Sequence, residues 1–593
     1  MSETKLPSVI FLLSQFWGNI TNRRRLQFLV LVILMVIASF AEILSIGSIL
    51  PFLSVLINPE KLFNYSQAQF LIHLIHAKSP SDLLLPMTML FGCAAFFAGF
   101  IRLLLLWAST RFSYGVGSEL SVEIYQRTLY QSYITHVNRN SSEVIDAITN
   151  KTERVTYLIM MVLNLLSSSI ILMTVLITLL VISPIIALSV FASLAFIYAC
   201  IINITRTRLL RNSTLIANES TRVLKCLQEG LGGIRDVLID NTQSAYCEVY
   251  KNADYPLRRA IGDNHFIGHS PRYVVEALGM ILIAAISFLL TQKTGGITSA
   301  IPILGALALG AQRLLPILQN AFGAWAGIRG TTATFQEVLL FLRQPFPDNF
   351  KSKTFTKLDF KKQLRFKQVC FRYSSDTPWV LQNFDLTIFK GERIGLVGIT
   401  GSGKSTVLDI VMGLLEPETG FLEVDGKAIL SHEDYRSWQT QIAHVPQSIF
   451  LADTSFAENI ALGVPKEKID YERVKEAAIQ AKIASMIEGL PRKYESLVGE
   501  RGVRLSGGQR QRIGIARALY KKADVIILDE ATSALDNKTE QDIIEAVENL
   551  SKDITIIMVA HRLSTLKNCS KIIEIVGGRV SRINSYSEIE NNY

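Results

Sequence analysis

The sequence predicts an all-α six-helix transmembrane domain followed by an α/β P-loop domain that binds a nucleotide. Its 593 residues are too many for one hydrophobic core, so at least two domains are expected. Long apolar runs continue to about residue 345, and the composition beyond is that of a soluble domain. A glycine-rich phosphate-binding motif lies in this second part. We therefore place the transmembrane domain at 1–345 and the nucleotide-binding domain at 346–593.

The overall composition agrees with a membrane protein. Mean hydropathy is +0.30 and charged residues make up 19% of the chain, so it is less polar than a soluble protein of this length. The formal net charge of +9 fits the Lys and Arg that membrane proteins gather on cytoplasmic loops, and we expect no nucleic-acid partner. The six cysteines form no CxxC pair or metal-ligand spacing, which favours reduced or lipid-buried thiols over disulfides.

Six apolar segments are long enough to cross a bilayer, which takes about 20 residues of helix. Glu42 and Pro51 interrupt the first segment, and no charged residue occurs in the 51 residues between Arg154 and Arg206. That stretch suits two spans with a turn at Pro184, since proline can break a helix. The predicted spans are about 26–57, about 84–109, two within 155–205, about 272–292 and about 299–327.

The distribution of Lys and Arg predicts the topology. Basic residues are dense in 111–154 and 206–271 but sparse in 58–83 and 293–298, so the first two segments and both termini should be cytoplasmic. The two basic segments contain few Gly or Pro residues, and we expect them to continue the spans as helices. Residues 5–20 are expected to form an amphipathic helix on the inner membrane surface, with a plain cytosolic helix as the alternative.

The segment "GLVGITGSGKST" has the spacing of a phosphate-binding P-loop. An apolar strand pattern precedes it and a helix-like stretch follows, which is the context that the motif requires. Amides of the loop would surround the phosphates at a helix N-terminus, with Lys404 on the β- and γ-phosphates and Ser405 on Mg²⁺. ATP and Mg²⁺ are therefore the expected cofactors. The predicted ATP contacts of this loop are Gly398, Gly401, Gly403, Lys404, Ser405 and Thr406.

An acidic pair ends a later apolar strand, in the segment "VIILDE". Taken alone, the pattern would be a strand followed by an acidic turn. After a P-loop, it predicts that Asp529 organises Mg²⁺ and that Glu530 aligns or deprotonates the attacking water.

Residues 505–512, "LSGGQRQR", lie between these two motifs and resemble the signature motif of ATP-binding cassette (ABC) proteins. The resemblance covers roughly 365–593. Ser506, Gly507 and Gly508 would open a helix, whose amides form a second anion site. In that family this site faces the γ-phosphate bound by the opposite subunit, so two ATP molecules lie between two cassettes. One membrane half and one cassette therefore imply a dimer, and a homodimer is the simpler expectation.

The resemblance implies roles for further residues, in family order. Tyr373 would stack on adenine, Gln447 of the Q-loop would touch Mg²⁺ and the membrane domain, and His561 would be the switch histidine at the γ-phosphate. Residues 499–502 are similar to the X-loop of exporters, and 533–536 to the D-loop. The motifs are complete, so both sites of a homodimer should hydrolyse ATP. The expected catalytic residues are Glu530, His561 and Gln447, and the expected Mg²⁺ ligands are Ser405, Gln447 and Asp529.

Three arginines lie in or at the ends of apolar spans. Arg102 is the one charged residue among the 28 between positions 82 and 111, Arg272 opens the fifth span, and Arg313 lies within the sixth. Three central, unpaired arginines would cost on the order of 8–10 kcal/mol. Pairing with Glu42 or Glu276 is one interpretation. The other is a substrate cavity for an anionic headgroup, because guanidinium forks suit phosphate oxygens.

The membrane half resembles type IV exporters of the ABC family, in which 132–140 and 237–244 would be the coupling helices. The order "FIRLLLL", "PRYVVEALG" and "AQRLLP" is similar to that of bacterial flippases of lipid-linked oligosaccharides in protein N-glycosylation. Those flippases carry an outer amphipathic helix after the first span, as residues 65–78 would provide here. The resemblance implies a multi-pass protein of the bacterial inner membrane with a cytoplasmic cassette. Its cargo would be a polyprenyl-pyrophosphate-linked oligosaccharide.

Three other classes of function agree with parts of this sequence. An exporter of a peptide, a drug or another lipid is the main alternative, because it changes the cargo and keeps the transport. A regulator or an ATP-gated channel is disfavoured by the intact acid Glu530. A soluble ATPase of the DNA-repair kind is excluded by the membrane half.

Overall fold

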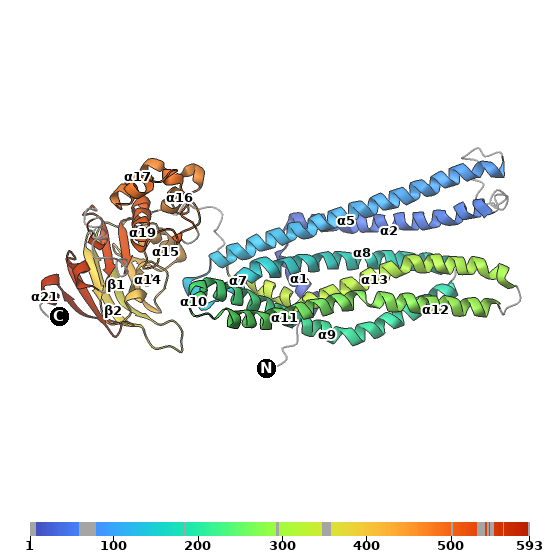
Figure 1. The fold of residues 1–593 in the computed structure, drawn as a ribbon, viewed down its shortest axis with the longest axis horizontal. Coiled ribbons are helices and arrows are strands. Elements are labelled where there is room, and N and C mark those ends of the chain that lie inside the picture. The colour runs from blue at the N-terminus through green and yellow to red at the C-terminus, as the bar shows by residue number, and fades with distance from the viewer. Residues whose placement is uncertain are drawn as a thin grey trace. The chain divides into compact units, whose positions relative to one another are not determined.

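A computed structural model gives the fold of the chain as two compact units (Figure 1), each treated by itself below. One unit comprises Met1–Gln131 and Asn138–Phe346, and the other comprises Ser132–Val137 and Pro347–Tyr593. The first is helical and the second is α/β, as the sequence predicts. The structure describes residues 7–57, 79–182, 184–291, 296–346, 357–499, 502–530, 540–541, 545, 551–560 and 562–590.

Long helices build the first unit, and they coincide with the six predicted spans (Figure 1). Within the described part of the chain, residues 22–45, 84–129, 141–178 and 191–232 are long and apolar enough to cross a membrane, and two further helices match the fifth and sixth spans. The long helices are α2 (Asn22–Ile57), α5 (Leu84–Leu129), α8 (Thr152–Ile182), α9 (Pro184–Gly232), α12 (Pro271–Thr291) and α13 (Gly296–Leu342). Shorter ones are α1 (Val9–Asn19), α7 (Ser141–Asp146), α10 (Ile234–Ile239) and α11 (Gln243–His269).

The helix boundaries test the predicted breaks. The break at Pro184 is confirmed, because α8 ends at Ile182 and α9 begins at Pro184. The first predicted span is confirmed as one helix, because α2 continues through Glu42 and Pro51 to Ile57. A proline is tolerated in a membrane helix when neighbouring helices satisfy the freed backbone groups. The predicted helical extensions are confirmed by α5 and α9, which run far beyond their apolar parts.

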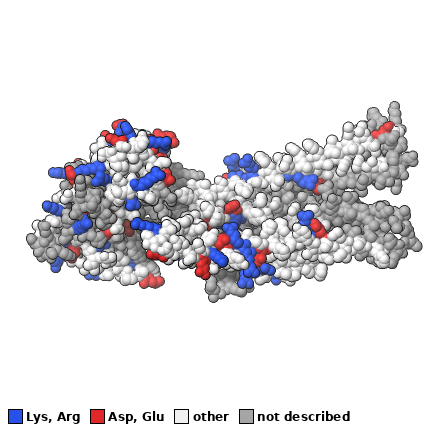
Figure 2. Space-filling view, in the orientation of Figure 1, with Lys and Arg blue, Asp and Glu red and all other residues white. Residues whose placement is uncertain are grey.

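Three pairs of helices pack side by side in this unit: α2 with α5, α8 with α13, and α9 with α11. The first two pairs share a core that contains Ile124, Leu158 and Phe335, whose side chains are buried. Many apolar side chains point outward instead, among them Phe96, which is 78% exposed. Figure 2 accordingly shows broad uncharged surfaces on this unit, with Lys and Arg gathered in a limited zone. An apolar surface of this extent is expected of helices that face lipid.

The N-terminal helix α1 is amphipathic. Leu12 and Phe16 are buried, and the Phe16 ring lies 5.5 Å from that of Phe335 on α13. Ile10 and Phe11 on the other face are exposed. The helix therefore packs on the helical unit along one side, and its contact with a membrane surface stays a prediction. The amphipathic helix predicted at 65–78 falls outside the described residues.

Two sheets form the frame of the α/β unit. A four-stranded antiparallel sheet has the order β2-β1-β4-β5, and a six-stranded sheet has the order β10-β9-β3-β8-β7-β6. In the second sheet β9, β3, β8, β7 and β6 run parallel, and β10 is antiparallel to β9. The strands are β1 (Gln363–Phe371), β2 (Leu381–Phe389), β3 (Arg393–Val397), β4 (Thr419–Val424), β5 (Lys427–Ile429), β6 (Ile442–Val445), β7 (Val525–Asp529), β8 (Thr555–Val559), β9 (Lys571–Val576) and β10 (Arg579–Asn584).

Helices cover these sheets and complete the unit. Strands β3, β7 and β8 are almost fully buried. Because these strands run parallel, their carboxyl ends bring the loops that follow them to one edge of the sheet. The helices are α14 (Lys404–Val411), α15 (His432–Gln439), α16 (Phe456–Ile460), α17 (Tyr471–Gln480), α18 (Ala484–Glu488), α19 (Gly507–Lys521) and α21 (Tyr586–Glu590).

Candidate nucleotide site and membrane arginines

The P-loop connects β3 to α14 as the motif requires. Gly398 has φ +151°, and a Cβ there would lie 2.4 Å from the carbonyl oxygen of Ile575. Gly403 caps α14 with φ +103°, and a Cβ there would lie 3.0 Å from Leu381 Cδ2. Neither position accepts a side chain, so the glycines are fixed by backbone geometry. The loop thereby turns its amides toward the start of α14, where a phosphate would bind.

Lys404 and Ser402 place two polar groups on this loop. The Lys404 Nζ donates to the carbonyl oxygens of Gly398 and Ile399, at 2.8 and 3.0 Å. The Ser402 Oγ is buried and has no hydrogen-bond partner among the described residues. Ser405 is exposed at the start of α14, and Thr406 is buried behind it. A lysine and an orphan hydroxyl at the loop fit an anionic phosphate chain.

Asp529 ends β7 beside this loop. Burial raises the pKa of its carboxyl, the adjacent Glu530 raises it further, and Lys404 lowers it. The structure thus brings the P-loop lysine and the predicted Mg²⁺ ligand close together. An oxygen donor set of Ser405 and Asp529 has the chemistry that Mg²⁺ prefers.

Glu530 is held in a strained but well-defined position. Its φ is +47°, in the left-handed region that non-glycine residues rarely occupy. Its amide donates to the Val559 carbonyl at 3.0 Å. Gln447 Nε2 donates to Glu530 Oε2 at 2.9 Å, so the structure joins the Q-loop residue to the predicted catalytic acid. Strain held by such contacts is typical of functional residues.

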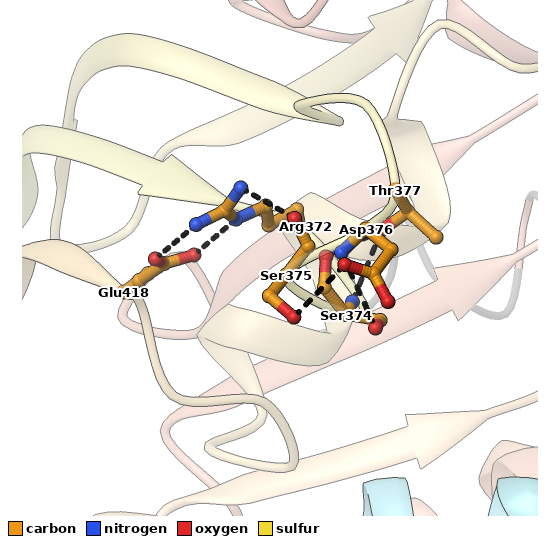
Figure 3. Close-up of polar contacts among 6 residues, drawn as sticks. All are labelled: Arg372, Ser374, Ser375, Asp376, Thr377 and Glu418. Carbon is orange, nitrogen blue, oxygen red and sulfur yellow. Dashed lines mark hydrogen bonds and ion pairs between the residues drawn. The ribbon is translucent and has the colours of Figure 1, made fainter.

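The loop that carries Tyr373 is fastened by its neighbour Arg372 (Figure 3). Arg372 makes two hydrogen bonds of 2.8 Å to the Glu418 carboxylate, and its Nη1 donates to the Ser375 carbonyl at 2.8 Å. These donors lower the pKa of Glu418. Tyr373 is 42% exposed, and its hydroxyl lies 3.3 Å from Thr406 Oγ1 on the P-loop helix. The aromatic ring is therefore beside the phosphate loop and available for stacking.

The signature segment opens α19 as predicted. Ser506 is its N-cap, with Oγ accepting from the Gln509 amide at 3.3 Å and the Ser506 amide donating to Gln509 Oε1 at 2.9 Å. This capping box places Gly507 and Gly508 in the first turn of the helix. The dipole of a 15-residue helix adds a favourable field for an anion there.

Several predicted site residues fall outside what the structure describes. His561 and the D-loop residues 533–536 are among them, as are two of the four X-loop residues at 499–502. Arg313 lies within α13, but its side chain is not described. The roles assigned to these residues stay predictions.

Asp409 is a site residue that the sequence reasoning missed. It lies on α14, where burial and, to a smaller extent, the neighbouring Asp529 raise the pKa of its carboxyl to about 6. Burial, Asp409 and Tyr373 together raise the pKa of Tyr133, which belongs to the short helix α6 (Tyr133–Asn138). Residues Ser132–Val137 group with the cassette, as expected for a coupling helix. A carboxylate in "TVLDIV" on a helix expected to be buried was the available signal.

Two of the membrane arginines are paired. Arg102 Nη1 lies 3.5 Å from Glu42 Oε2, and Arg272 Nε donates to Glu276 Oε1 at 2.8 Å. The Arg102 side chain is 50% exposed and that of Glu42 only 7%. Loss of the ion pair would therefore destabilise the buried Glu42 carboxylate more than the solvent-accessible Arg102 guanidinium. The Arg102 distance exceeds the 2.7–2.9 Å usual for a charge-assisted hydrogen bond, and its guanidinium keeps an accessible face.

Comparisons with known proteins agree with the fold and the site. The family model "ABC transporter transmembrane region" matches residues 27–292, and the model "ABC transporter" matches 381–533. Two proteins named "ATP-dependent lipid A-core flippase" are similar. That of Alkalilimnicola ehrlichii is 32% identical over 369 residues, 61% of each chain. That of Cupriavidus metallidurans is 42% identical over 229 residues, 38% of each.

Two further likenesses extend over most of the chain. YgaD of Bacillus subtilis, described as a candidate multidrug export ATP-binding/permease protein, is 29% identical over 496 residues and 82% of each chain. A solved structure of a bacterial Atm1-family ABC exporter with ATP bound has the same fold, with a TM-score of 0.74 over 96% of both chains at 22% identity.

The helical unit is a membrane domain, and the α/β unit with its nucleotide site is a P-loop ATP-binding cassette. The chain belongs to the ABC transporters, and it has the layout of a type IV exporter half-transporter, with one helical unit and one cassette.

Proposed function

We propose that this protein is an ATP-driven flippase for an anionic lipid, and that it works as a homodimer in the bacterial inner membrane with its cassettes in the cytoplasm. The proposed cargo is a polyprenyl-pyrophosphate-linked oligosaccharide. One observation carries the cargo assignment. The Arg102 guanidinium is accessible, and it is the one charged group in an otherwise uncharged segment of its helix.

ATP hydrolysis would use the residues gathered at the sheet edge. Lys404 and the P-loop amides hold the phosphates, while Tyr373 stacks on the base. Glu530 accepts a proton from the attacking water, and its hydrogen bond from Gln447 orients the carboxylate. A bound Mg²⁺, held by Ser405, Gln447 and Asp529, would supply charge neutralisation at the phosphates. His561 would contact the γ-phosphate.

The cargo assignment rests on electrostatics inside an apolar domain. A headgroup with phosphate charges needs compensating donors to cross a bilayer. Arg102, Arg272 and Arg313 are proposed to provide them, and the partial exposure of the first two side chains leaves donors for a ligand. Without bound cargo, the paired acids would neutralise the arginines, so that the cavity carries no uncompensated charge.

The relatives support a lipid cargo in general. The matched flippases are named for lipid A-core, although this chain spans only 61% and 38% of their lengths. An exporter of drugs is the second candidate, favoured by the likeness to YgaD over 82% of both chains. A neutral, apolar drug would have no use for arginines in the membrane domain.

Exposed apolar residues on α10 support its assignment as a coupling helix. Leu238 and Ile239 are 55% and 64% exposed, on a segment where the family places a coupling helix. Such side chains are expected to be covered by another protein surface, which a cassette would provide. The basic segments 111–154 and 206–271 support a cytoplasmic orientation through the positive-inside rule.

The decisive test is ATPase activity of the full-length protein in lipid vesicles. We expect polyprenyl-pyrophosphate saccharides to stimulate hydrolysis several-fold over basal turnover. An uncharged drug panel should leave it within about twofold. Stimulation by uncharged drugs alone would overturn the cargo assignment and leave an ATP-driven exporter.

A further inference from the structure

A cavity of about 650 Å³ lies within the helical unit, walled by α8, α9, α11 and α13. Its volume is within the range of small-molecule sites, about 300–1,000 Å³. The α9 wall begins at Ile216, beyond the charge-free stretch, and the α11 wall ends at His269, three residues before Arg272. The cavity therefore belongs to the charged ends of the helices.

The lining combines polar donors with apolar side chains. Arg154 and Arg258 contribute two guanidiniums, against the single carboxylate of Glu153. Asn264, His265 and His269 add further polar groups, and the remaining lining is largely apolar or glycine. Four of those remaining residues are Tyr157, Leu227, Ile261 and Gly327. A surface of this kind suits a charged group attached to an apolar one.

The buried acid nearest to Arg154 in the sequence, Asp146, already has four partners. Asp146 is fully buried and accepts hydrogen bonds from Ser220, Thr221 and Asn150 at 2.8–2.9 Å. The Asp146 carboxylate also lies 3.4 Å from Lys151 Nζ. Among the residues that the structure describes, no hydrogen bond or ion pair is assigned to Arg154, which is half-buried in the cavity wall. A guanidinium in that setting is a strong site for an anion.

The other polar groups of the lining are partly occupied. Arg258 Nε donates to Asp254 at 3.1 Å, and Asn264 Oδ1 accepts from Asn212 at 2.9 Å, which leaves the Asn264 amide hydrogens. His265 and His269 stack with ring centroids 4.3 Å apart. His269 Nδ1 lies 2.9 Å from the His265 carbonyl oxygen, so the tautomer that donates there keeps Nε2 for a ligand.

We propose that this cavity is a loading site, which holds the phosphate-bearing headgroup of a lipid before it reaches Arg102 and Arg272. Arg154 binds the phosphate oxygens, Asn264 and His269 contact the headgroup, and Tyr157 and Ile261 pack against its apolar part. The site rests on the proposed function, because it assumes an anionic lipid cargo that enters from the cytoplasmic side.

Binding of geranylgeranyl pyrophosphate to the full-length transporter in detergent tests this site. Arg154→Gln is expected to weaken binding about tenfold or more, the loss that a charge-assisted hydrogen bond implies. Ile261→Trp fills the cavity and is expected to weaken binding to a similar degree. The matched control is Arg259→Gln, an exposed neighbour on α11 outside the lining, which should bind within about twofold of wild type.

The outcomes separate the loading site from the cargo class. Wild-type binding that Arg154→Gln and Ile261→Trp both leave intact would overturn the loading site alone. No binding by the wild type would overturn the proposed cargo class, and this inference with it. Free inorganic pyrophosphate should bind at least tenfold more weakly than the lipid, because it lacks the apolar contacts; equal binding would contradict a lipid ligand. Thermal unfolding of each variant shows that it is folded.

Discussion

The cassette and the helical unit offer two different answers to the problem of holding negative charge. In the cassette the donors belong largely to the backbone, aimed by glycines at Gly398 and Gly403 whose geometry excludes side chains. In the helical unit the donors are guanidiniums, and two of them are balanced by acids on their own or a neighbouring helix. A backbone site is recorded in sequence as a fixed spacing. A side-chain site in a helix is recorded only as a charge among apolar residues.

The strongest test of the cassette side is Glu530→Gln. The amide cannot accept a proton, so hydrolysis should fall by about 10²–10⁴-fold while ATP stays bound. Steady-state phosphate release and nucleotide retention measure the two effects. Glu476→Gln, an exposed acid on α17, is the control and should hydrolyse at the wild-type rate. Substantial residual turnover in Glu530→Gln would show that the general-base role is wrong.

The membrane side can be tested by separating charge pairing from cargo binding. Arg102→Ala leaves the buried Glu42 carboxylate without this ion pair, so lower thermal stability and about tenfold slower lipid transport are expected. The double variant Arg102→Gln with Glu42→Gln removes both charges together. It should regain stability without regaining transport. Recovery of both would mean that Arg102 serves the structure alone.

A smaller effect is expected from Gln447→Ala. Its hydrogen bond of 2.9 Å orients Glu530, and losing one neutral-to-charged hydrogen bond should slow hydrolysis about two- to tenfold. ATP affinity measured without turnover should change little if orientation is the main role. A loss as large as that of Glu530→Gln would make Gln447 a direct participant in catalysis.

The parts of the molecule that sequence predicts are those with a repeating or fixed pattern. Apolar runs predict the spans, and Pro184 ends a helix as expected. Pro51 does not, because a proline within a membrane helix can be accommodated by its neighbours. The P-loop and signature residues follow from spacing.

Residues whose role depends on tertiary contacts could not be predicted in this way. Asp409 becomes a site residue only because folding buries it near Asp529. Arg154 has no assigned hydrogen bond or ion pair among the described residues, while Asp146 contacts Ser220, Thr221, Asn150 and Lys151. Neither fact has a spacing that a sequence could display. The sequence allows two interpretations of Arg102, and pairing with Glu42 is one of them. The exposed fractions of the two side chains, which distinguish the interpretations, depend on the fold.

The smallest expected effect concerns pH and the cassette alone. Burial lowers the pKa of His444 below its ordinary value of 6.5, so the unfolded chain binds a proton there that the folded one does not. Stability from this group is therefore present above pH 6.5 and is lost as the pH falls toward the lowered pKa. His444→Gln should reduce the drop in unfolding temperature between pH 7.5 and about pH 5.5. An unchanged drop would assign the pH dependence to other groups.

The central claim is that ATP hydrolysis drives an anionic headgroup past guanidiniums in the helical unit. The most direct measurement is translocation in proteoliposomes of two fluorescent lipids that share chain and sugar. One carries a pyrophosphate link and the other an uncharged link. We predict ATP-dependent flipping of the pyrophosphate lipid at least tenfold faster than that of its uncharged analogue. Equal rates, or faster flipping of the uncharged lipid, would contradict the account.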